Sequence, residues 1–159
     1  MPSDLVAELK QSKPFACPEL ELYLSLVRTT DLLSRKPSSL LKEKGLSHAQ
    51  YNVLRILRGA GPEGLPCGEI GSRMVTRDPD VTRLLDRLEQ RKLVARGRST
   101  ADRRVVTTHI TEGGLALIKA FDQSLANLHK QQLAFLGTKT VQTLLRQLAV
   151  IRDSLVNNS

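Results

Sequence analysis

A chain of 159 residues is long enough for one domain, or for a small domain with an oligomerisation region attached. Hydrophobic residues make up 40% of it and the aromatic residues are only two Tyr and three Phe, so the core must consist mainly of Leu, Val and Ile. No run of about 18 apolar residues occurs and no apolar stretch follows the N-terminal charges, which argues against a membrane span or a signal peptide and predicts a cytoplasmic protein.

The formal net charge of +8 is concentrated in one segment. Between Arg73 and Arg104 there are ten basic and five acidic side chains, and nine of the ten basic ones are arginine. The planar guanidinium group matches phosphates and guanine edges, so this segment favours a nucleic-acid partner over a diffuse solvated surface. A membrane surface is disfavoured because no broad Trp or Phe face accompanies the arginines.

The residues that build metal sites and enzymes do not occur in the required patterns. Cys17 and Cys67 have no CxxC spacing, and His48, His109 and His129 show no ligand spacing, so we expect two ordinary thiols, no metal site and no cofactor. The Gly-rich segment from Gly59 to Gly71 lacks the Gly-Lys-Ser/Thr ending of a phosphate-binding loop. The enzyme motifs HExxH and GxSxG are also absent from the sequence. We therefore expect no catalytic residues and no enzymatic activity.

The N-terminal third predicts an arm followed by a helix. Residues 1–18 show no clear period and are expected to form a partly ordered arm. Apolar residues at helical spacing predict a helix from Glu19, which Pro37 should break or kink. A short second piece, Ser38 to Lys44, should end at Gly45 as a C-cap.

Short elements are expected in the middle of the chain. Ser47 and Gln50 form the pattern of a capping box, which opens a helix ending by Gly59. Leu65 fits a single short strand, and residues 68–74 fit a helix too brief to stand without a partner.

The partner helix follows after a tight turn. Asp78 and Pro79 fit the N-cap and the first position of this helix, and apolar residues then recur at three-and-four spacing up to Arg91. The helix is followed by Lys92 and Leu93 where a glycine is common, so a non-glycine residue is expected in the left-handed conformation there.

The last third predicts a hairpin and two helices. Residues 94–98 and 105–110 are β-branched or extended runs around a polar loop, which is typical of a two-stranded wing. Thr111 should cap a long helix that closes near Gly137, and Thr138 should cap another.

The terminal helices carry apolar stripes that need a partner. These stripes lie outside the helix-turn-helix and wing at 46–111, and no internal repeat supplies a surface for them. The simplest partner is a second copy of the chain in a two-fold interface. We therefore expect a homodimer with a helical dimerisation region at 19–45 and 112–159.

Three motifs occur in the order typical of one family. They are LSHAQY at 46–51, VTRLLDRLE at 81–89, and Asp102-Arg103-Arg104 leading to ITEGG at 110–114. Together they resemble the MarR family of winged helix-turn-helix transcriptional regulators. The resemblance implies a mainly α fold with a small β-hairpin wing, and a homodimer that binds a palindromic double-stranded DNA operator, represses transcription and is released by a small aromatic or phenolic effector.

Candidate DNA-binding residues lie on the recognition helix and the wing. Arg83 is the first choice for a base contact, because the apolar residues of its helix turn inward and leave it on the opposite side. The resemblance implies that Asp102 holds the wing loop and that Arg103 reaches DNA, in a minor groove. The full set is Arg77, Asp80, Thr82, Arg83, Arg87, Arg96, Arg98, Asp102, Arg103 and Arg104.

Several alternatives remain open from sequence. Arg83 and Arg87 also fit solvated helix residues paired with nearby acids, and Arg104 fits a solvated turn residue. Asp80 fits either an acceptor for a cytosine amino group or a buttress for an arginine. At the level of function, the alternatives are a cysteine-based redox-sensing regulator of the same fold, involving Cys17 or Cys67, and a winged-helix module that binds protein.

Overall fold

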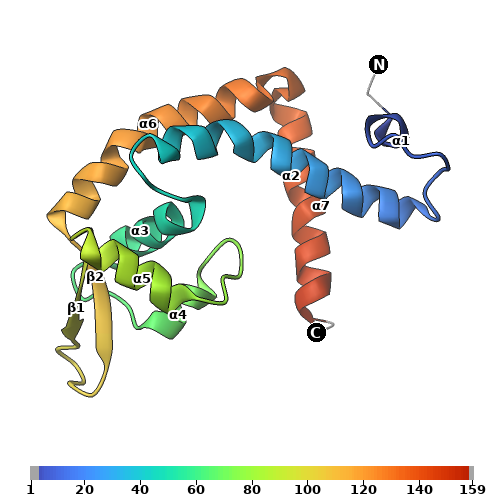
Figure 1. The fold of residues 1–159 in the computed structure, drawn as a ribbon. Helices are drawn as coiled ribbons and strands as arrows, with labels where there is room; N and C mark the ends of the chain where they lie inside the picture. Colours follow the sequence, from blue (N-terminus) through green and yellow to red (C-terminus); the bar gives the residue numbers. More distant parts are fainter. Residues whose placement is uncertain (1–3, 158–159) are drawn as a thin grey trace. The chain divides into compact units, whose positions relative to one another are not determined.

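The computed structural model describes residues 4–157 and is mainly helical, with one two-stranded antiparallel sheet (Figure 1), as the sequence predicts. The elements run in the order α1 (Leu5–Glu8), α2 (Pro18–Lys42), α3 (His48–Ala60), α4 (Cys67–Ser72), α5 (Val81–Gln90), β1 (Val94–Arg98), β2 (Val106–Ile110), α6 (Glu112–Leu133), the 3-10 turn η1 (Ala134–Leu136) and α7 (Gly137–Asn157). The chain divides into two compact units, one up to Lys119 and one from Ala120.

The N-terminal arm contains a helical turn that the sequence did not reveal. In α1 the Asp4 side chain accepts a hydrogen bond from the Val6 backbone N–H at 3.0 Å, so a capping residue organises this single turn. Glu8 lies 3.8 Å from the Arg28 guanidinium of α2. Residues 1–3 of the predicted arm, and residues 158–159 of the predicted dimerisation region, lie outside the described residues.

Of the break or kink predicted at Pro37, the break is wrong, because α2 continues through this residue to Lys42. A proline inside a helix removes one backbone hydrogen bond, but the bonds on either side remain. Pro37 and Leu41 are also the buried residues of α2, and burial of apolar surface offsets the lost bond. The helix ends at Lys42, with Glu43 as its C-cap, slightly ahead of the predicted cap at Gly45. Gly45 has a φ of +67°, which suits glycine, and lies in the turn that follows.

The turn after α2 leads directly into α3. The N–H of Gly45 donates to the carbonyl of Lys42 at 2.9 Å, and the N–H of Leu46 donates to the carbonyl of Leu41 at 3.1 Å. The predicted capping box of Ser47 and Gln50 is confirmed, with both of its hydrogen bonds present at 3.0 and 3.1 Å.

The core of the first unit lies between α3, α4, α5 and the sheet. Its fully buried residues come from each of these elements and from α6, and they include Leu54, Leu57, Ile70, Leu85, Leu88, Val94 and Ile118. The inward orientation predicted for Val81, Leu84, Leu85 and Leu88 of α5 is confirmed for the three leucines, which are buried, while Val81 is half-buried. Aliphatic burial therefore positions α5 with its polar side outward.

The wing strands pair antiparallel, with Val94 opposite Ile110 and Arg98 opposite Val106. Leu65 adds a one-residue bridge on the other side of β2, through two hydrogen bonds of 2.9 Å with Thr108. The preceding Gly64 has a φ of +67°, and a Cβ there would lie 2.2 Å from the Thr108 carbonyl oxygen. Only glycine fits this approach without a shift of the backbone.

The start of α5 differs from the prediction by two residues. Asp80, not Asp78, is its N-cap, and Pro79 precedes the helix. Asp78 instead accepts a hydrogen bond from the Asp80 N–H at 2.8 Å, which shapes the turn before the helix. At the other end, the left-handed non-glycine residue expected after α5 is confirmed as Lys92, with a φ of +57°.

The long helices begin close to their predicted caps. The Thr111 hydroxyl accepts from the Gly114 N–H at 3.1 Å at the start of α6, as predicted. In the second unit α7 begins at Gly137, so Thr138 lies within its first turn rather than ahead of it. None of the helices formed by residues 4–157 has the length and apolarity that a membrane crossing requires.

Candidate nucleic-acid interface

Asp80 organises the N-terminal end of α5. Its Oδ1 accepts from the Arg83 N–H at 3.1 Å, and its Oδ2 lies 3.1 Å from Arg83 Nε. One carboxylate therefore both caps the helix and contacts the arginine, an arrangement compatible with the buttress role. The Arg83 side chain remains 76% exposed, so the ion pair leaves its outer edge available to a ligand.

The turn that leads into α5 is anchored from α3. The Val75 N–H donates to Asn52 Oδ1 at 2.8 Å, and the Asp78 carboxylate closes the next part of the turn. Arg77 between them is exposed. Thr82 and Arg87 are exposed on α5 itself. With Arg77 and Arg83 they make four exposed candidate side chains on this helix and the turn before it.

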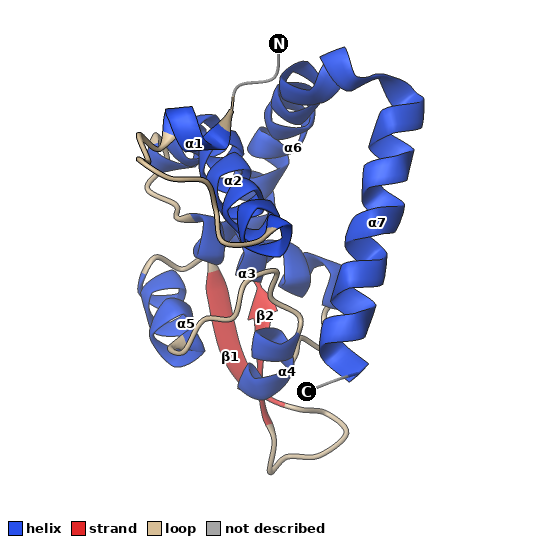
Figure 2. Cartoon of the chain, turned by 90° about the vertical axis from the view of Figure 1, so that its right-hand side faces the viewer, coloured by secondary structure: helices blue, strands red, loops and turns tan. Residues whose placement is uncertain are grey.

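The wing loop connects β1 and β2 (Figure 2), and its own polar groups hold it in shape. Asp102 Oδ1 accepts from the Arg104 N–H at 2.9 Å, and the Asp102 carbonyl accepts from the Val105 N–H at 2.9 Å. Arg98 Nη1 donates to the Arg103 carbonyl oxygen at 2.8 Å. These bonds fix the backbone on either side of Arg103 while the Arg103 and Arg104 side chains stay exposed.

Arg96 occupies a different position from the other candidates. Its Nη2 lies 2.6 Å from Asp86 Oδ1, its Nη1 lies 2.8 Å from Glu89 Oε2, and its backbone N–H donates to Glu89 Oε1 at 3.3 Å. The hydrogen bond to Asp86, with the charges of both acids, raises the pKa of Arg96 above its ordinary value against a smaller opposing effect of burial. The guanidinium thus joins wing strand β1 to the polar side of α5.

The structure therefore divides the arginines of the basic segment into two groups. Arg91 and Arg96 bind groups from other elements of the chain, and Arg73 forms an ion pair with Glu69. The other six have exposed side chains on α5, on the turn before it, and on the wing: Arg77, Arg83, Arg87, Arg98, Arg103 and Arg104.

Three supporting residues were missed by sequence reasoning. Asn52 holds the turn before α5, Glu63 Oε2 accepts from the Thr100 hydroxyl of the wing loop at 2.7 Å, and Arg91 binds the end of α2. Their partners are 23, 37 and 46 positions away in the chain. No local pattern predicts contacts of this range.

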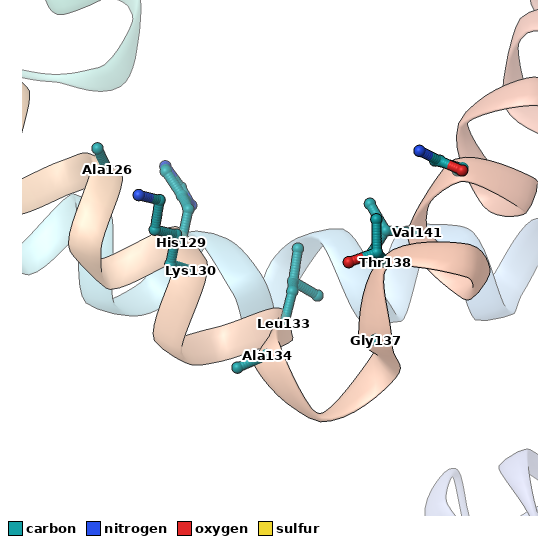
Figure 3. Close-up of a pocket in the computed structure, with 9 residues that line it drawn as sticks. Ala126, His129, Lys130, Leu133, Ala134, Gly137, Thr138 and Val141 are labelled. Atoms are coloured by element: carbon teal, nitrogen blue, oxygen red, sulfur yellow. The ribbon is translucent and has the colours of Figure 1, made fainter.

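The second unit contains an open groove where α6, η1 and α7 meet (Figure 3). Its volume is about 510 Å³, and its lining is mostly apolar. His129, Lys130 and Leu133 line one side, and Thr138 and Val141 line the other. Among residues 4–157 no group of three or more His, Cys, Asp or Glu side chains is arranged to hold a metal ion.

Comparison with known proteins agrees with this arrangement. The model of the MarR family matches residues 46–106, which span α3 to the first residue of β2. The chain is 30% identical to the HTH-type transcriptional regulator MhqR of Bacillus subtilis (strain 168) over 99 residues. This matched region covers 62% of the present chain and 67% of MhqR.

Two solved structures extend the likeness beyond the family model. A crystal structure of a MarR transcription factor from Planctomyces limnophilus is 36% identical and has a TM-score of 0.64, covering 86% of this chain and 99% of that one. The S. aureus MepR–DNA complex has a TM-score of 0.73 over 83% of this chain and 97% of MepR. At 22% identity MepR supports the winged-helix fold alone.

Proposed function

This chain belongs to the MarR family of transcriptional regulators, and from that premise we propose that it binds double-stranded DNA sequence-specifically through α5 and the wing. The observation that carries this proposal is the exposed Arg83, oriented by Asp80 on a helix whose opposite side is buried. A family of regulators also accounts for the lack of enzyme motifs.

Helix α5 is proposed to enter the major groove. A guanidinium that a neighbouring carboxylate holds in place loses little conformational entropy when it forms a two-fold hydrogen bond with a guanine edge. Arg83 fits this base-reading role. Thr82 and the exposed Arg87 and Arg77 fit contacts to base edges or phosphates around it.

The wing is proposed to contact the adjacent minor groove and backbone. Asp102 holds the loop, and Arg103 then projects toward the narrow negative groove. Arg104 and Arg98 fit phosphate contacts, with Arg98 also closing the loop through the Arg103 carbonyl. Arg96 is proposed to position the wing rather than to contact phosphate, because two carboxylates already bind its guanidinium.

A homodimer is proposed to form through residues 19–45 and 112–159, with the DNA-binding domain at 46–111. Large apolar side chains are exposed on both terminal helices, which supports burial against a second copy. They are Leu20, Leu22, Tyr23, Leu26, Val27 and Leu32 of α2, and Leu144, Leu145, Val150, Ile151, Leu155 and Val156 of α7.

The sign and control of regulation are further proposals. A dimer bound over a promoter excludes polymerase, so we propose a repressor, and the family resemblance favours release by a small aromatic or phenolic effector. The apolar groove of the second unit, with Lys130 and His129 on one side, is chemically compatible with such a ligand. Cys67 Sγ lies 3.7 Å from the Thr82 hydroxyl, which keeps redox control by this thiol as the second candidate.

Fluorescence anisotropy tests the DNA-binding proposal. A symmetric duplex is first selected from a random pool by the full-length wild-type chain, and its affinity is then measured across salt concentrations. We expect half-sites one duplex turn apart, about 34–36 Å. Arg103→Ala should weaken binding to most duplexes and lower the salt slope by about one, and Arg83→Ala should also relax the preference at one base pair.

The control is Lys139→Ala, which removes a charge from α7 and should leave the affinity unchanged. Unaltered affinity in both arginine variants contradicts the residue assignment, and a selected site without two-fold symmetry contradicts the dimer. Repeating the titration with salicylate and with hydrogen peroxide separates effector release from thiol oxidation, since only the second is abolished by Cys67→Ser. A chain that selects no duplex at all favours the protein-binding alternative.

A further inference from the structure

Arg91 follows α5 directly and binds the end of α2. Its Nη1 donates to the Gly45 carbonyl oxygen at 2.6 Å, and its Nη2 donates to the Lys44 carbonyl oxygen at 2.9 Å. Both carbonyls lie just beyond the C-terminus of α2, where the partial negative charge of the helix dipole favours a cation. The planar guanidinium fork satisfies two adjacent acceptors at once.

The guanidinium joins two turns of fixed shape. On the α5 side, the N–H of Lys92 donates to the backbone carbonyl of Glu89 at 2.8 Å, and the N–H of Leu93 donates to the backbone carbonyl of Leu88 at 3.0 Å. On the α2 side, the corresponding two bonds close the turn at Gly45. Leu88 and Leu93 are buried, so the turn that carries Arg91 is anchored in the core. A shift at the end of α2 is therefore coupled to the end of α5 through short, directional bonds.

We propose that Arg91 is a positioning residue for DNA recognition, which sets the separation of the two recognition helices in the dimer by fixing α5 to the end of α2. This inference rests on the proposed function, because α2 belongs to the proposed dimerisation region. In this role the guanidinium of Arg91 binds the two backbone carbonyls rather than a phosphate. It controls the spacing between half-sites rather than the affinity for each half-site.

Operator spacing provides the test. The duplexes are the symmetric site selected by the full-length wild-type chain, and the same site with one base pair inserted or removed at its centre. Each step moves the half-sites by about 3.4 Å along the duplex and rotates one against the other. Arg91→Gln should reduce the preference for the selected spacing roughly tenfold, the factor that corresponds to one charge-assisted hydrogen bond. Arg91→Lys has a single ammonium group in place of the planar fork, so its spacing preference should lie between those of the wild type and Arg91→Gln.

The matched control is Arg87→Gln, which removes the same charge from the preceding turn of α5. Because Arg87 is a proposed DNA contact, this variant should weaken binding to all three duplexes alike and lower the salt slope by about one. Arg91→Gln should leave the salt slope unchanged. The proposal is overturned if Arg91→Gln behaves like Arg87→Gln, or if it keeps the wild-type spacing preference. A wild type that prefers no symmetric duplex contradicts the proposed function instead, before any variant is measured.

A second measurement needs no DNA. Spin labels at Gln90→Cys, in a background with Cys17→Ser and Cys67→Ser, report the distance between the two copies of α5 by electron-electron double resonance. The distance distribution should be narrow with Arg91 present and broader in Arg91→Gln, at unchanged helix content by circular dichroism. Identical distributions overturn the proposal.

Discussion

Replacing Arg96 tests whether the wing is attached to the recognition helix by electrostatics. Arg96→Gln removes the guanidinium that lies 2.6 Å from Asp86 and 2.8 Å from Glu89. The packing of the buried Val94 on the same strand should be unchanged. Glu89→Gln removes one of the two charges and keeps the shape of the side chain. The pair of variants and their combination form a double-mutant cycle.

The expected magnitude follows from exposure. The side chains of Arg96, Asp86 and Glu89 are 29%, 47% and 40% exposed, so solvent screens both ion pairs substantially. Exposed pairs contribute about 0.2–1 kcal/mol each, and hydrogen bonds to charged groups contribute more when they are shielded. We expect Arg96→Gln to lower the free energy of unfolding by about 1–2 kcal/mol, or roughly 2–8 °C in melting temperature. The coupling between Arg96 and Glu89 should be about 0.5–1 kcal/mol.

The pH dependence has a definite sign. The pKa of Arg96 is raised in the folded state, so its contribution is complete below the unfolded-state pKa and is lost only as pH rises through the still higher folded-state pKa. The coupling should therefore stay constant between neutral and moderately alkaline pH. It should decrease with added salt.

Thermal unfolding followed by circular dichroism, at fixed protomer concentration, measures these quantities. Arg87→Gln is the matched control for stability, because it removes a positive charge from an exposed position of α5 and should change the free energy of unfolding by less than about 0.5 kcal/mol. A coupling near zero, or an equal loss in the control, would refute the attachment. If Arg96→Gln instead lowered the salt slope of DNA binding, Arg96 would be a phosphate contact rather than a residue that positions the wing.

Three further predictions concern single positions. Gly64→Ala should cost about 2–3 kcal/mol of unfolding free energy, because its Cβ meets the Thr108 carbonyl at 2.2 Å; chemical denaturation measures this, and a wild-type midpoint would contradict the geometry. Lys92→Gly should raise stability by about 1 kcal/mol by relieving a φ of +57°, and a destabilised variant in the same assay would show that the lysine side chain matters more than the backbone. Leu145→Glu should raise the dimer dissociation constant at least about tenfold by sedimentation, whereas Gln147→Glu on the other side of α7 should not; equal effects would argue against this face as the interface.

Local patterns predicted much of the fold because their causes are local. The capping box at Ser47, the glycine after α2 and the left-handed Lys92 each depend on residues within five positions, so sequence contains the whole interaction. Local sequence does not decide which of Asp78 and Asp80 is the N-cap of α5, because both residues suit an N-cap and Pro79 is compatible with either. The packing of Leu84, Leu85 and Leu88 against the core selects Asp80.

The candidate interface was less predictable, because arginines serve two purposes in this segment. Counting charge between positions 73 and 104 cannot separate Arg83, which is exposed, from Arg91 and Arg96, which bind other elements. Asp86 and Glu89 are three positions apart and so share one side of α5, which is the one sequence signal for a bound cation there. Which cation they bind is decided by the packing of β1 on α5.

Both edges of the sheet are partly occupied by groups of the same chain. On one side of β2 the single residue Leu65 is the only addition that residues 4–157 make, and it is too short to template another strand. On the free side of β1, the Arg96 N–H is already bonded to the Glu89 carboxylate. An edge strand whose outward N–H is bonded within the chain has one donor fewer for pairing with a strand of a neighbouring molecule, so the contact that orients the wing also disfavours edge-to-edge association.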